Sequence, residues 1–274
     1  MARNQPPGGQ APVVQRVRIR YAKRGPLRFT SHRDFARAFE RAIHRAGVPI
    51  AYSQGFTPHP KVSYASAAPT GVASEAEYLE IGLRERVDVA LLARALDAAL
   101  SPGLDVLDAV EAPVGGSLAD RIDAGSWAVE LPGVDADTAR RAVAAFLAAD
   151  EVPVERLTKQ GRRTFDARGP VASLVVRDAA GVSAADGVPS EVAAAPCAIL
   201  DLVVRQVTPT VRPDDVLSGL RVVADLEPPV PPRATRLAQG ALTVQDVLVD
   251  PLEDSLETSA VADRQQAVIG ASTR

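Results

Sequence analysis

The sequence predicts an α+β protein made of two tandem βαββαβ units with antiparallel sheets. Three observations lead to this prediction. Short segments alternate apolar and polar residues, which indicates strands with one buried face. Between them lie segments with apolar residues at helical spacing. The order of these elements then repeats in the second half of the chain, and 274 residues are enough for two domains.

The first half supplies one full series of elements. Residues 14–22 alternate apolar and basic side chains, a pattern typical of a strand. Ser31 caps a helix, Asp34 completes an approximate capping box, and Phe35 and Phe39 lie on the apolar stripe of that helix. The other elements are expected at 27–29 as a short extension of the first strand, at 49–52, 61–66, 78–83 and 104–110 as strands, and at 87–100 as a helix.

The second half repeats this order. Its expected elements are a strand at 126–131, a helix at 135–149, strands at 152–159 and 162–167 around a Gln160-Gly161 turn, a strand at 199–207, a short helix from Arg212 and a strand at 242–249. The βαββαβ order fits a ferredoxin-like sandwich. We therefore expect a disordered arm at 1–14, a basic ferredoxin-like domain with the site at 15–113, a second ferredoxin-like domain at 114–253 with a mobile insertion near 179–195, and a tail at 254–274.

Composition excludes several classes of protein. A single cysteine, Cys197, excludes an internal disulfide framework and a cysteine cluster for zinc or iron–sulfur. The longest apolar runs fall short of the ~20 residues that span a bilayer. The N-terminal residues lack the apolar segment of a secretory signal. We expect a cytoplasmic protein that needs no membrane and no cofactor.

Charge is distributed unevenly along the chain. Residues 1–61 hold twelve basic and two acidic side chains, a net charge of +10, whereas the other residues hold 19 basic and 32 acidic ones, a net charge of −13. Eight of the eleven aromatic residues and all three histidines also precede residue 80. Such asymmetry points to a polyanionic partner. The alternative is that the acidic part of the chain neutralises the basic part.

One face of the first helix carries four arginines at i, i+4 spacing, Arg33, Arg37, Arg41 and Arg45, with Glu40 beside them. A solvated helix face is the ordinary explanation, but like charges at this spacing repel one another, which favours an anionic partner. Arginine also suits bidentate contacts with phosphate. The residues expected to bind nucleic acid are Lys23, Arg28, Arg33, Arg37, Arg41, Arg45, Tyr52, Ser53, Phe56 and Lys61.

His32, Asp34 and His59 are the candidate catalytic residues. His32 lies at the positive end of a helix, which disfavours its protonated form. His59 lies between two prolines in a loop, where functional residues concentrate. Because the loop after the second strand of a β-α-β unit returns to the end where the helix began, we expect His32 to approach His59. Structural roles are the alternative for both, and His44 is expected to be structural or to face phosphate.

The motifs in this segment are long. They are Ser31-His32-x-Asp34, the Arg-Ala-x-x-Arg-Ala run of 41–46, the Tyr-Ser-x-Gly-Phe-x-Pro-His-Pro-Lys run of 52–61, the Gly-Val-x-Ser-Glu-x-Glu-Tyr run of 71–78, and the later elements 165–168 and 212–214. The chain resembles in these motifs the radical-SAM-linked protein family, a bacterial domain of unknown function encoded beside or fused to a radical SAM protein, often near ribonuclease E/G genes. The resemblance spans roughly residues 15–250. It implies an RNA- or ribosome-related setting and a radical SAM protein as a partner.

Three functions remain open. The leading hypothesis is an RNA-binding accessory protein in which the arginines and Lys61 hold phosphates, Tyr52 or Phe56 stacks a base, and His32 and Asp34 orient it. The second is a metal-independent ribonuclease that uses His32 and His59 as general acid and base. A metal-dependent variant would use His32, Asp34 and His59, although we expect no metal site. The third is a protein-only adaptor for the radical SAM partner. We favour a protein without catalytic activity.

Overall fold

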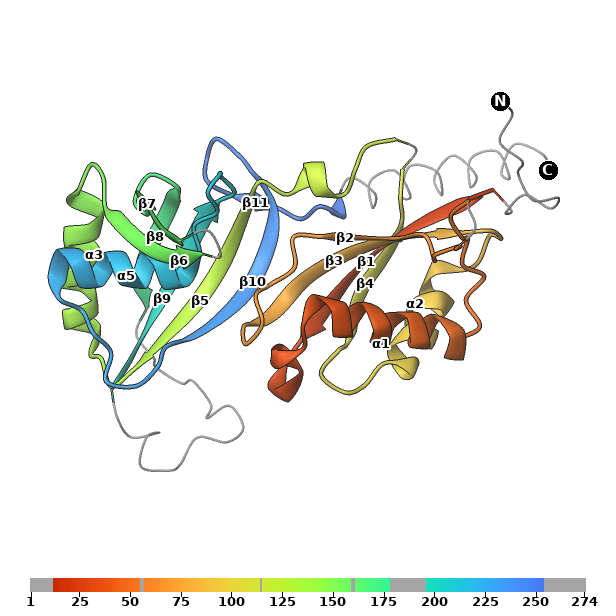
Figure 1. The fold of residues 1–274 in the computed structure, drawn as a ribbon, viewed down its shortest axis with the longest axis horizontal. Helices are drawn as coiled ribbons and strands as arrows, with labels where there is room; N and C mark the ends of the chain where they lie inside the picture. The colour runs from red at the N-terminus through yellow and green to blue at the C-terminus, as the bar shows by residue number, and fades with distance from the viewer. Residues whose placement is uncertain (1–11, 55–56, 114, 159–160, 178–195, 254–274) are drawn as a thin grey trace, which may run out of the picture. The chain divides into compact units, whose positions relative to one another are not determined.

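The computed structural model describes residues 12–54, 57–113, 115–158, 161–177 and 196–253. Most of the expected arm, Phe56, the expected insertion and the tail lie outside the described residues. The described part is a mixed α/β structure with mostly antiparallel strands and four α-helices (Figure 1). It forms two compact units, the first made of Met1–Arg121 and Asp250–Arg274 and the second of Ile122–Val249.

The first unit has one four-stranded sheet with both of its α-helices on the same face (Figure 1). Its strands follow the order β4-β1-β3-β2, and each neighbouring pair is antiparallel. Its elements are β1 (Gln15–Lys23), the 3-10 helix η1 (Gly25–Phe29), α1 (His32–Arg45), β2 (Val62–Ala65), β3 (Ala73–Leu83), α2 (Val89–Ala99), β4 (Val106–Glu111) and the 3-10 helix η2 (Ala119–Arg121).

Two predicted segments of the first unit differ from the structure. Residues 27–29 are not an extension of the first strand, because Pro26 starts a 3-10 turn that includes them. Residues 49–52 form isolated bridges at Ile50 and Tyr52 and no continuous strand. The second strand of the unit is therefore β2, which begins only at Val62.

The core of the first unit follows from the alternation in β1 and the periodicity of α1. Val17, Ile19 and Tyr21 of β1 are buried on the face that the helices cover. The predicted stripe of α1 packs on them, and the Tyr21 and Phe35 rings stack with centroids 4.2 Å apart. Ser31 caps α1, because its hydroxyl oxygen accepts a bond from the Asp34 amide at 3.2 Å and its O–H donates to the Asp34 carboxylate.

The second unit has the strand order β10-β5-β9-β8, again with antiparallel neighbours, and β11 is added beside β10. A hairpin of β6 and β7 forms a separate two-stranded sheet. The elements are β5 (Ala124–Pro132), α3 (Ala136–Ala148), β6 (Pro153–Thr158), β7 (Gly161–Asp166), β8 (Val171–Arg177), β9 (Cys197–Arg205), α5 (Pro213–Ala224), β10 (Arg233–Leu242) and β11 (Leu248–Val249).

The predicted closing strand of the second unit was placed too late. The closing strand is β10, which ends at Leu242, where the predicted strand was expected to begin. The predicted range 242–249 instead holds a turn at Thr243 and Asp246, followed by the two-residue β11. Asp246 has a positive φ of 58°, which a continuous strand does not allow. The sequence prediction also omitted β8.

The arginines of β1 that point away from the helices are neutralised within the first unit. Arg18 is fully buried, and its Nε donates to Glu80 at 3.0 Å. Arg16 donates to the other oxygen of the same carboxylate at 2.9 Å, and Arg20 pairs with Asp108. Part of the charge asymmetry is thus internal pairing.

We expect Glu80→Ala to destabilise the first unit by about 3 kcal/mol or more, because it leaves the Arg18 guanidinium buried without its carboxylate. Hydrogen exchange of the β1 and β3 amides measures this loss. Glu85→Ala is the matched control, since Glu85 pairs with Arg84 on the surface and such pairs contribute about 0–1 kcal/mol. Equal exchange rates in the two variants would contradict the prediction.

Asp166 closes the turn that follows the β6–β7 hairpin. Its carboxylate accepts bonds from the backbone amides of Val152, Arg168 and Gly169 at 2.9, 2.8 and 2.7 Å. Burial opposes ionisation of this carboxyl, but the three amide bonds outweigh it and hold the pKa of Asp166 below its ordinary value. A lowered pKa means that the ionised carboxylate stabilises the fold above the pKa of the unfolded chain, about 3.9.

We expect Asp166→Asn to cost about 1 kcal/mol at neutral pH, because an amide cannot accept all three bonds. The cost should shrink as the pH falls below about 4, since the wild-type carboxyl then binds a proton in the unfolded chain while it is still ionised in the folded one, which favours unfolding. Denaturant unfolding followed by the fluorescence of Trp127, the single tryptophan, measures both values in the second unit. A difference between variant and wild type that stays constant from pH 7 to pH 3 would count against this account.

Candidate nucleic-acid interface

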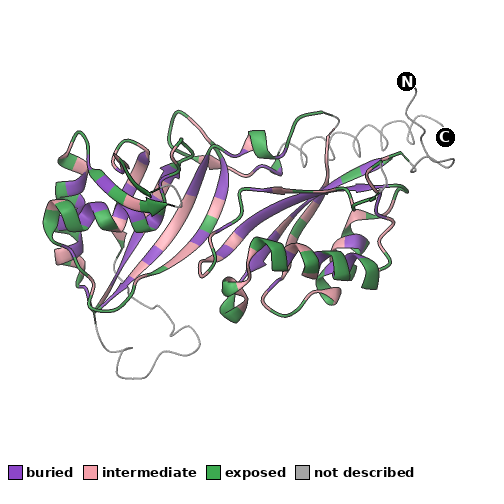
Figure 2. Ribbon diagram, in the orientation of Figure 1, coloured by how far each residue is buried: buried purple, intermediate pink, exposed green. Residues whose placement is uncertain are grey.

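The exposed face of α1 carries unpaired positive charge. Arg33, Arg37 and Arg41 are exposed, and none of them forms an ion pair or hydrogen bond with any residue in the described part of the chain. We call these three residues the α1 ridge. Figure 2 shows the exposed side of α1 facing away from the sheet, while its buried side faces the strands. The ridge therefore offers three guanidinium groups that the fold itself does not use.

The spacing of the ridge follows from helix geometry. Residues four apart rise by about 6 Å along the axis and lie on one face. Asp34 and Glu40 are also exposed on this helix, but no ion pair joins either of them to the ridge. The three guanidinium groups thus form a row with regular spacing along the helix.

Two predicted contact residues are engaged elsewhere. Lys23 is only 4 % exposed, and its ammonium donates to the backbone oxygens of Ala68 and Pro69. It is therefore almost completely buried and is not placed in this structure to contact the phosphate that the sequence analysis expected. Arg45 is exposed, but its guanidinium donates to the carbonyl of Ala99 at the end of α2. That bond holds α1 against α2 and leaves Arg45 only partly available.

An exposed aromatic side chain lies just before the ridge. Phe29 is 59 % exposed at the end of η1, and the Arg28 guanidinium lies over its ring at 4.5 Å. The loop that contains Gly71 is hydrogen-bonded beside this ring, because the Gly71 amide donates to the carbonyl of Arg28. Gly71 has no side chain there, so the loop comes close to the Phe29 ring without covering it. An exposed ring beside cations is the combination that stacks bases in single-stranded nucleic acids.

His32 packs at the start of α1 against Tyr64 of β2. Their rings meet edge to face with centroids 4.8 Å apart. Burial, with the Glu40 carboxylate adding to it, raises the pKa of the Tyr64 phenol. The phenol therefore stays protonated, and its ring packs against the exposed imidazole of His32 beside the ridge.

His32 and His59 lie at opposite ends of the sheet. Ala65 of β2 and Arg20 of β1 both pair with Tyr78, so Ala65 lies beside the end of β1. By the same register Val62 of β2 lies level with Val17, near the start of β1. His59 precedes β2 and so lies beyond the start of β1, whereas His32 follows the end of β1. The prediction that the two histidines approach each other is wrong. No cluster of His, Cys, Asp and Glu among the described residues could hold a metal ion.

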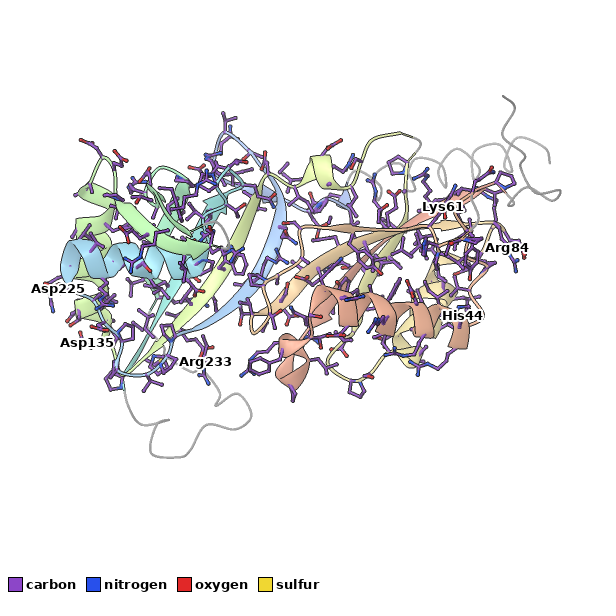
Figure 3. All side chains as sticks on the ribbon, viewed as in Figure 1. His44, Lys61, Arg84, Asp135, Asp225 and Arg233 are labelled. Atoms are coloured by element: carbon purple, nitrogen blue, oxygen red, sulfur yellow. The ribbon has the colours of Figure 1, made fainter. Side chains whose placement is uncertain are left out.

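The loop that carries His59 is closed by its own backbone. The amide of Ser53 donates to the carbonyl of His59 at 2.8 Å, and the Ser53 hydroxyl accepts from the His59 amide at 2.9 Å. Tyr52 is half-buried against the core of the first unit. Lys61 is exposed, and Figure 3 places it at the same end of the unit as His44 and Arg84. Ser53 and Tyr52 thus shape the loop, and Lys61 remains as a cation at the far end of α1.

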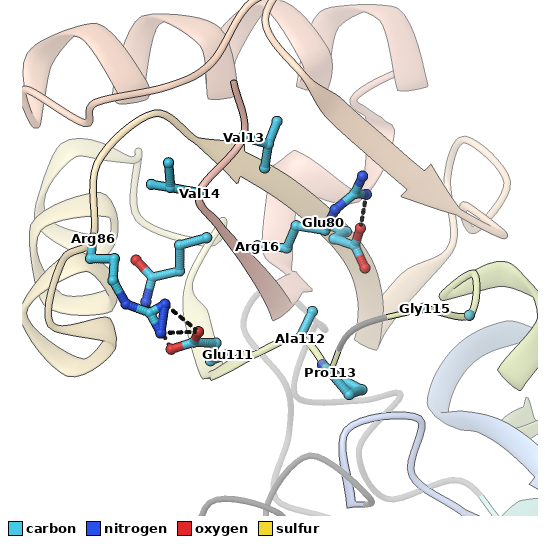
Figure 4. Close-up of a pocket in the computed structure, with 11 residues that line it drawn as sticks. Val13, Val14, Arg16, Glu80, Arg86, Glu111, Ala112, Pro113 and Gly115 are labelled. Carbon is cyan, nitrogen blue, oxygen red and sulfur yellow. Dashed lines mark hydrogen bonds and ion pairs between the residues drawn. The ribbon is translucent and has the colours of Figure 1, made fainter. Parts of the chain in front are cut away.

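A pocket of about 600 Å³ opens in the first unit beside the start of β1 (Figure 4). Its two arginines are already paired, Arg16 with Glu80 at 2.9 Å and Arg86 with Glu111 at 3.0 Å. None of the predicted site residues lines it. The pocket has no excess charge that would select an anion.

Phe29 is the residue that sequence reasoning missed. It was assigned to a strand extension, where its side chain would alternate with its neighbours. The signal that could have identified it is Pro26, which favours the first turn of a helix and places Phe29 at the end of a 3-10 turn.

Comparison with known proteins identifies the family. Residues 16–213 match the family model described as uncharacterized protein conserved in bacteria (DUF2344). None of the curated proteins matches the chain. No helix in the described residues is long and apolar enough to cross a membrane. Because the match covers well over half of the sequence, the chain belongs to the DUF2344 family of bacteria.

Proposed function

We propose that this chain binds RNA through the α1 ridge and acts as an accessory protein to a radical SAM protein. The observation that carries the proposal is the contrast between two sets of arginines in one unit. Those of β1 and the following turn pair with Glu80, Asp108 and Glu75, whereas those of the ridge have no partner in the described residues. A row of unpaired guanidinium groups repels itself until an anion binds.

RNA is favoured over other polyanions because the ridge continues into an exposed aromatic ring. Backbone phosphates would bind Arg33, Arg37 and Arg41, and an unpaired base would stack on Phe29 beside Arg28. His32, held by Tyr64, lies at the junction of the two groups of residues and is in a position to contact the same nucleotide. The resemblance to proteins encoded near ribonuclease genes and radical SAM genes supports this choice.

We also infer that both units are ferredoxin-like. In each unit the βαββαβ elements are arranged so that the last strand lies beside the first and the second lies at the far edge, namely β4-β1-β3-β2 and β10-β5-β9-β8. This antiparallel order is the one expected for that fold. Binding rather than catalysis fits the first unit, since the two candidate catalytic histidines lie at opposite ends of its sheet.

We expect the triple variant Arg33→Ala, Arg37→Ala, Arg41→Ala to weaken RNA binding strongly and to flatten its dependence on salt. Three lost phosphate contacts reduce the slope of log K against log salt concentration by about 2 for a single strand. Fluorescence anisotropy with single-stranded and structured RNA, at several salt concentrations, measures both effects.

The matched control removes three exposed arginines from another surface of the same unit, in Arg84→Ala, Arg86→Ala, Arg94→Ala. It changes the net charge equally, so wild-type binding by this control separates a local site from a general charge effect. Equal loss in both triple variants, or wild-type affinity that does not change with salt, would overturn the assignment to the ridge.

We expect Phe29→Ala to lower affinity for single-stranded RNA by about 1–3 kcal/mol, the amount that one stacked base contributes. The salt slope should not change, because no charge is lost. Phe29→Tyr should retain most of the affinity, since it keeps the aromatic face. Anisotropy titrations of the two variants decide the matter, and full affinity in Phe29→Ala would exclude a stacked base at this ring.

A further inference from the structure

The β6–β7 hairpin of the second unit has no counterpart in the first. It lies in the chain between α3 and β8, where the first unit passes from α1 to β2 with only isolated bridges. It pairs with no other strand in the described residues. Two-stranded hairpins are marginal by themselves in water, so this one depends on what holds its base.

The hairpin is joined to α5 by an ion pair with a buried carboxylate. Arg156 of β6 donates through its Nε to Asp215 of α5 at 3.0 Å, and Asp215 is 6 % exposed. Arg156 also lies over the Phe165 ring at 4.7 Å, and Val154 is buried in the core of the second unit. A buried carboxylate is costly unless it is paired. The ion pair therefore fixes the orientation of the hairpin relative to α5.

The outer half of the hairpin is exposed and cationic. Leu157 is 80 % exposed and lies directly across from Arg162, which is exposed and, within the described residues, pairs with the exposed Glu155. Arg163 is exposed and has no ion-pair partner among the residues that the structure describes. An apolar side chain so exposed, with Arg162 across from it, lies outside the core of the second unit as the described residues form it.

Charge singles out the hairpin within its unit. Residues 153–166 hold four basic and two acidic side chains, a net charge of +2. The other residues of 122–249 hold 9 basic and 15 acidic side chains, a net charge of −6. The hairpin is thus a positive surface on an acidic unit, and it attracts an anionic partner that the rest of the unit repels.

We propose that this hairpin is a second RNA contact of the chain, in which Arg162 and Arg163 bind backbone phosphates and Leu157 lies against a sugar or base. The inference rests on the proposed function in that the ligand is again RNA, but it uses a different unit and different residues. Charge complementarity selects the occupant, because the exposed charged groups on the described residues of the hairpin are two guanidinium groups and one carboxylate, that of Glu155.

The test is a salt titration of RNA binding by full-length Arg162→Ala, Arg163→Ala. Its matched control is Arg140→Ala, Arg141→Ala, two adjacent exposed arginines on α3 of the same unit. We expect the hairpin variant to reduce the salt slope by about 1.4–1.8, the share of two phosphate contacts, and the control to leave it unchanged. Leu157→Thr, which keeps strand propensity, should weaken binding several-fold with no change in slope.

The outcomes separate the two proposals. If wild type binds RNA, the α1 ridge variant loses binding and the hairpin variant matches its control, the hairpin inference is overturned and the proposed function stands. If the hairpin variant loses binding and the ridge variant does not, the hairpin is the contact and the assignment to the ridge fails. If wild type does not bind RNA at low salt, both proposals are overturned. Far-ultraviolet circular dichroism of each variant confirms that it is folded.

Discussion

The pairing of the β1 arginines with carboxylates determines which charges the first unit can offer to a partner. β1 lies between β4 and β3, so its side chains on the face away from the helices meet acidic residues on both neighbours. Glu80 alone accepts from Arg16 and Arg18, and Arg18 has no exposed surface. Burying the Arg18 guanidinium without its carboxylate partner would cost several kcal/mol. The same sheet meets α1 through side chains such as Tyr21 and Tyr64, and among the described residues no ion pair joins a sheet carboxylate to the α1 ridge.

How well the sequence predicted each element depends on how much of its pattern is local. α1 could be predicted with its cap and stripe, because Ser31, Asp34, Phe35 and Phe39 act within a few residues of one another. β10 could not, since its buried positions include Arg236 and Gln239 and so lack the apolar alternation of an ordinary strand. There the sheet neighbours and the cation–π contact of Arg236 with Trp127 decide the structure, and both are distant in sequence.

The separation of the two histidines has one topological cause. In a β-α-β unit, the loop after the second strand lies at the end of the sheet where the helix starts. The loop before the second strand lies at the opposite end, where the helix stops. Residues 49–52 look like a strand in sequence but form only bridges, and the real second strand begins at Val62. His59 therefore precedes that strand instead of following it. The motif is local, but the end of the sheet at which it lies depends on the register between β2 and β3.

A net charge of −3 does not conflict with a polyanionic ligand, because the range of electrostatic forces is short. At physiological ionic strength the screening length is about 8 Å, slightly more than the rise of about 6 Å between successive members of the α1 ridge. Neighbouring guanidinium groups therefore act together on a phosphate chain, whereas carboxylates several screening lengths away contribute little. The local density of unpaired charge thus governs binding, and it is high only where the fold provides no internal carboxylate. In the described part of the first unit the β1 arginines are held in ion pairs and the α1 ridge is not, which is why two arginine-rich segments so close in sequence differ in what they can bind.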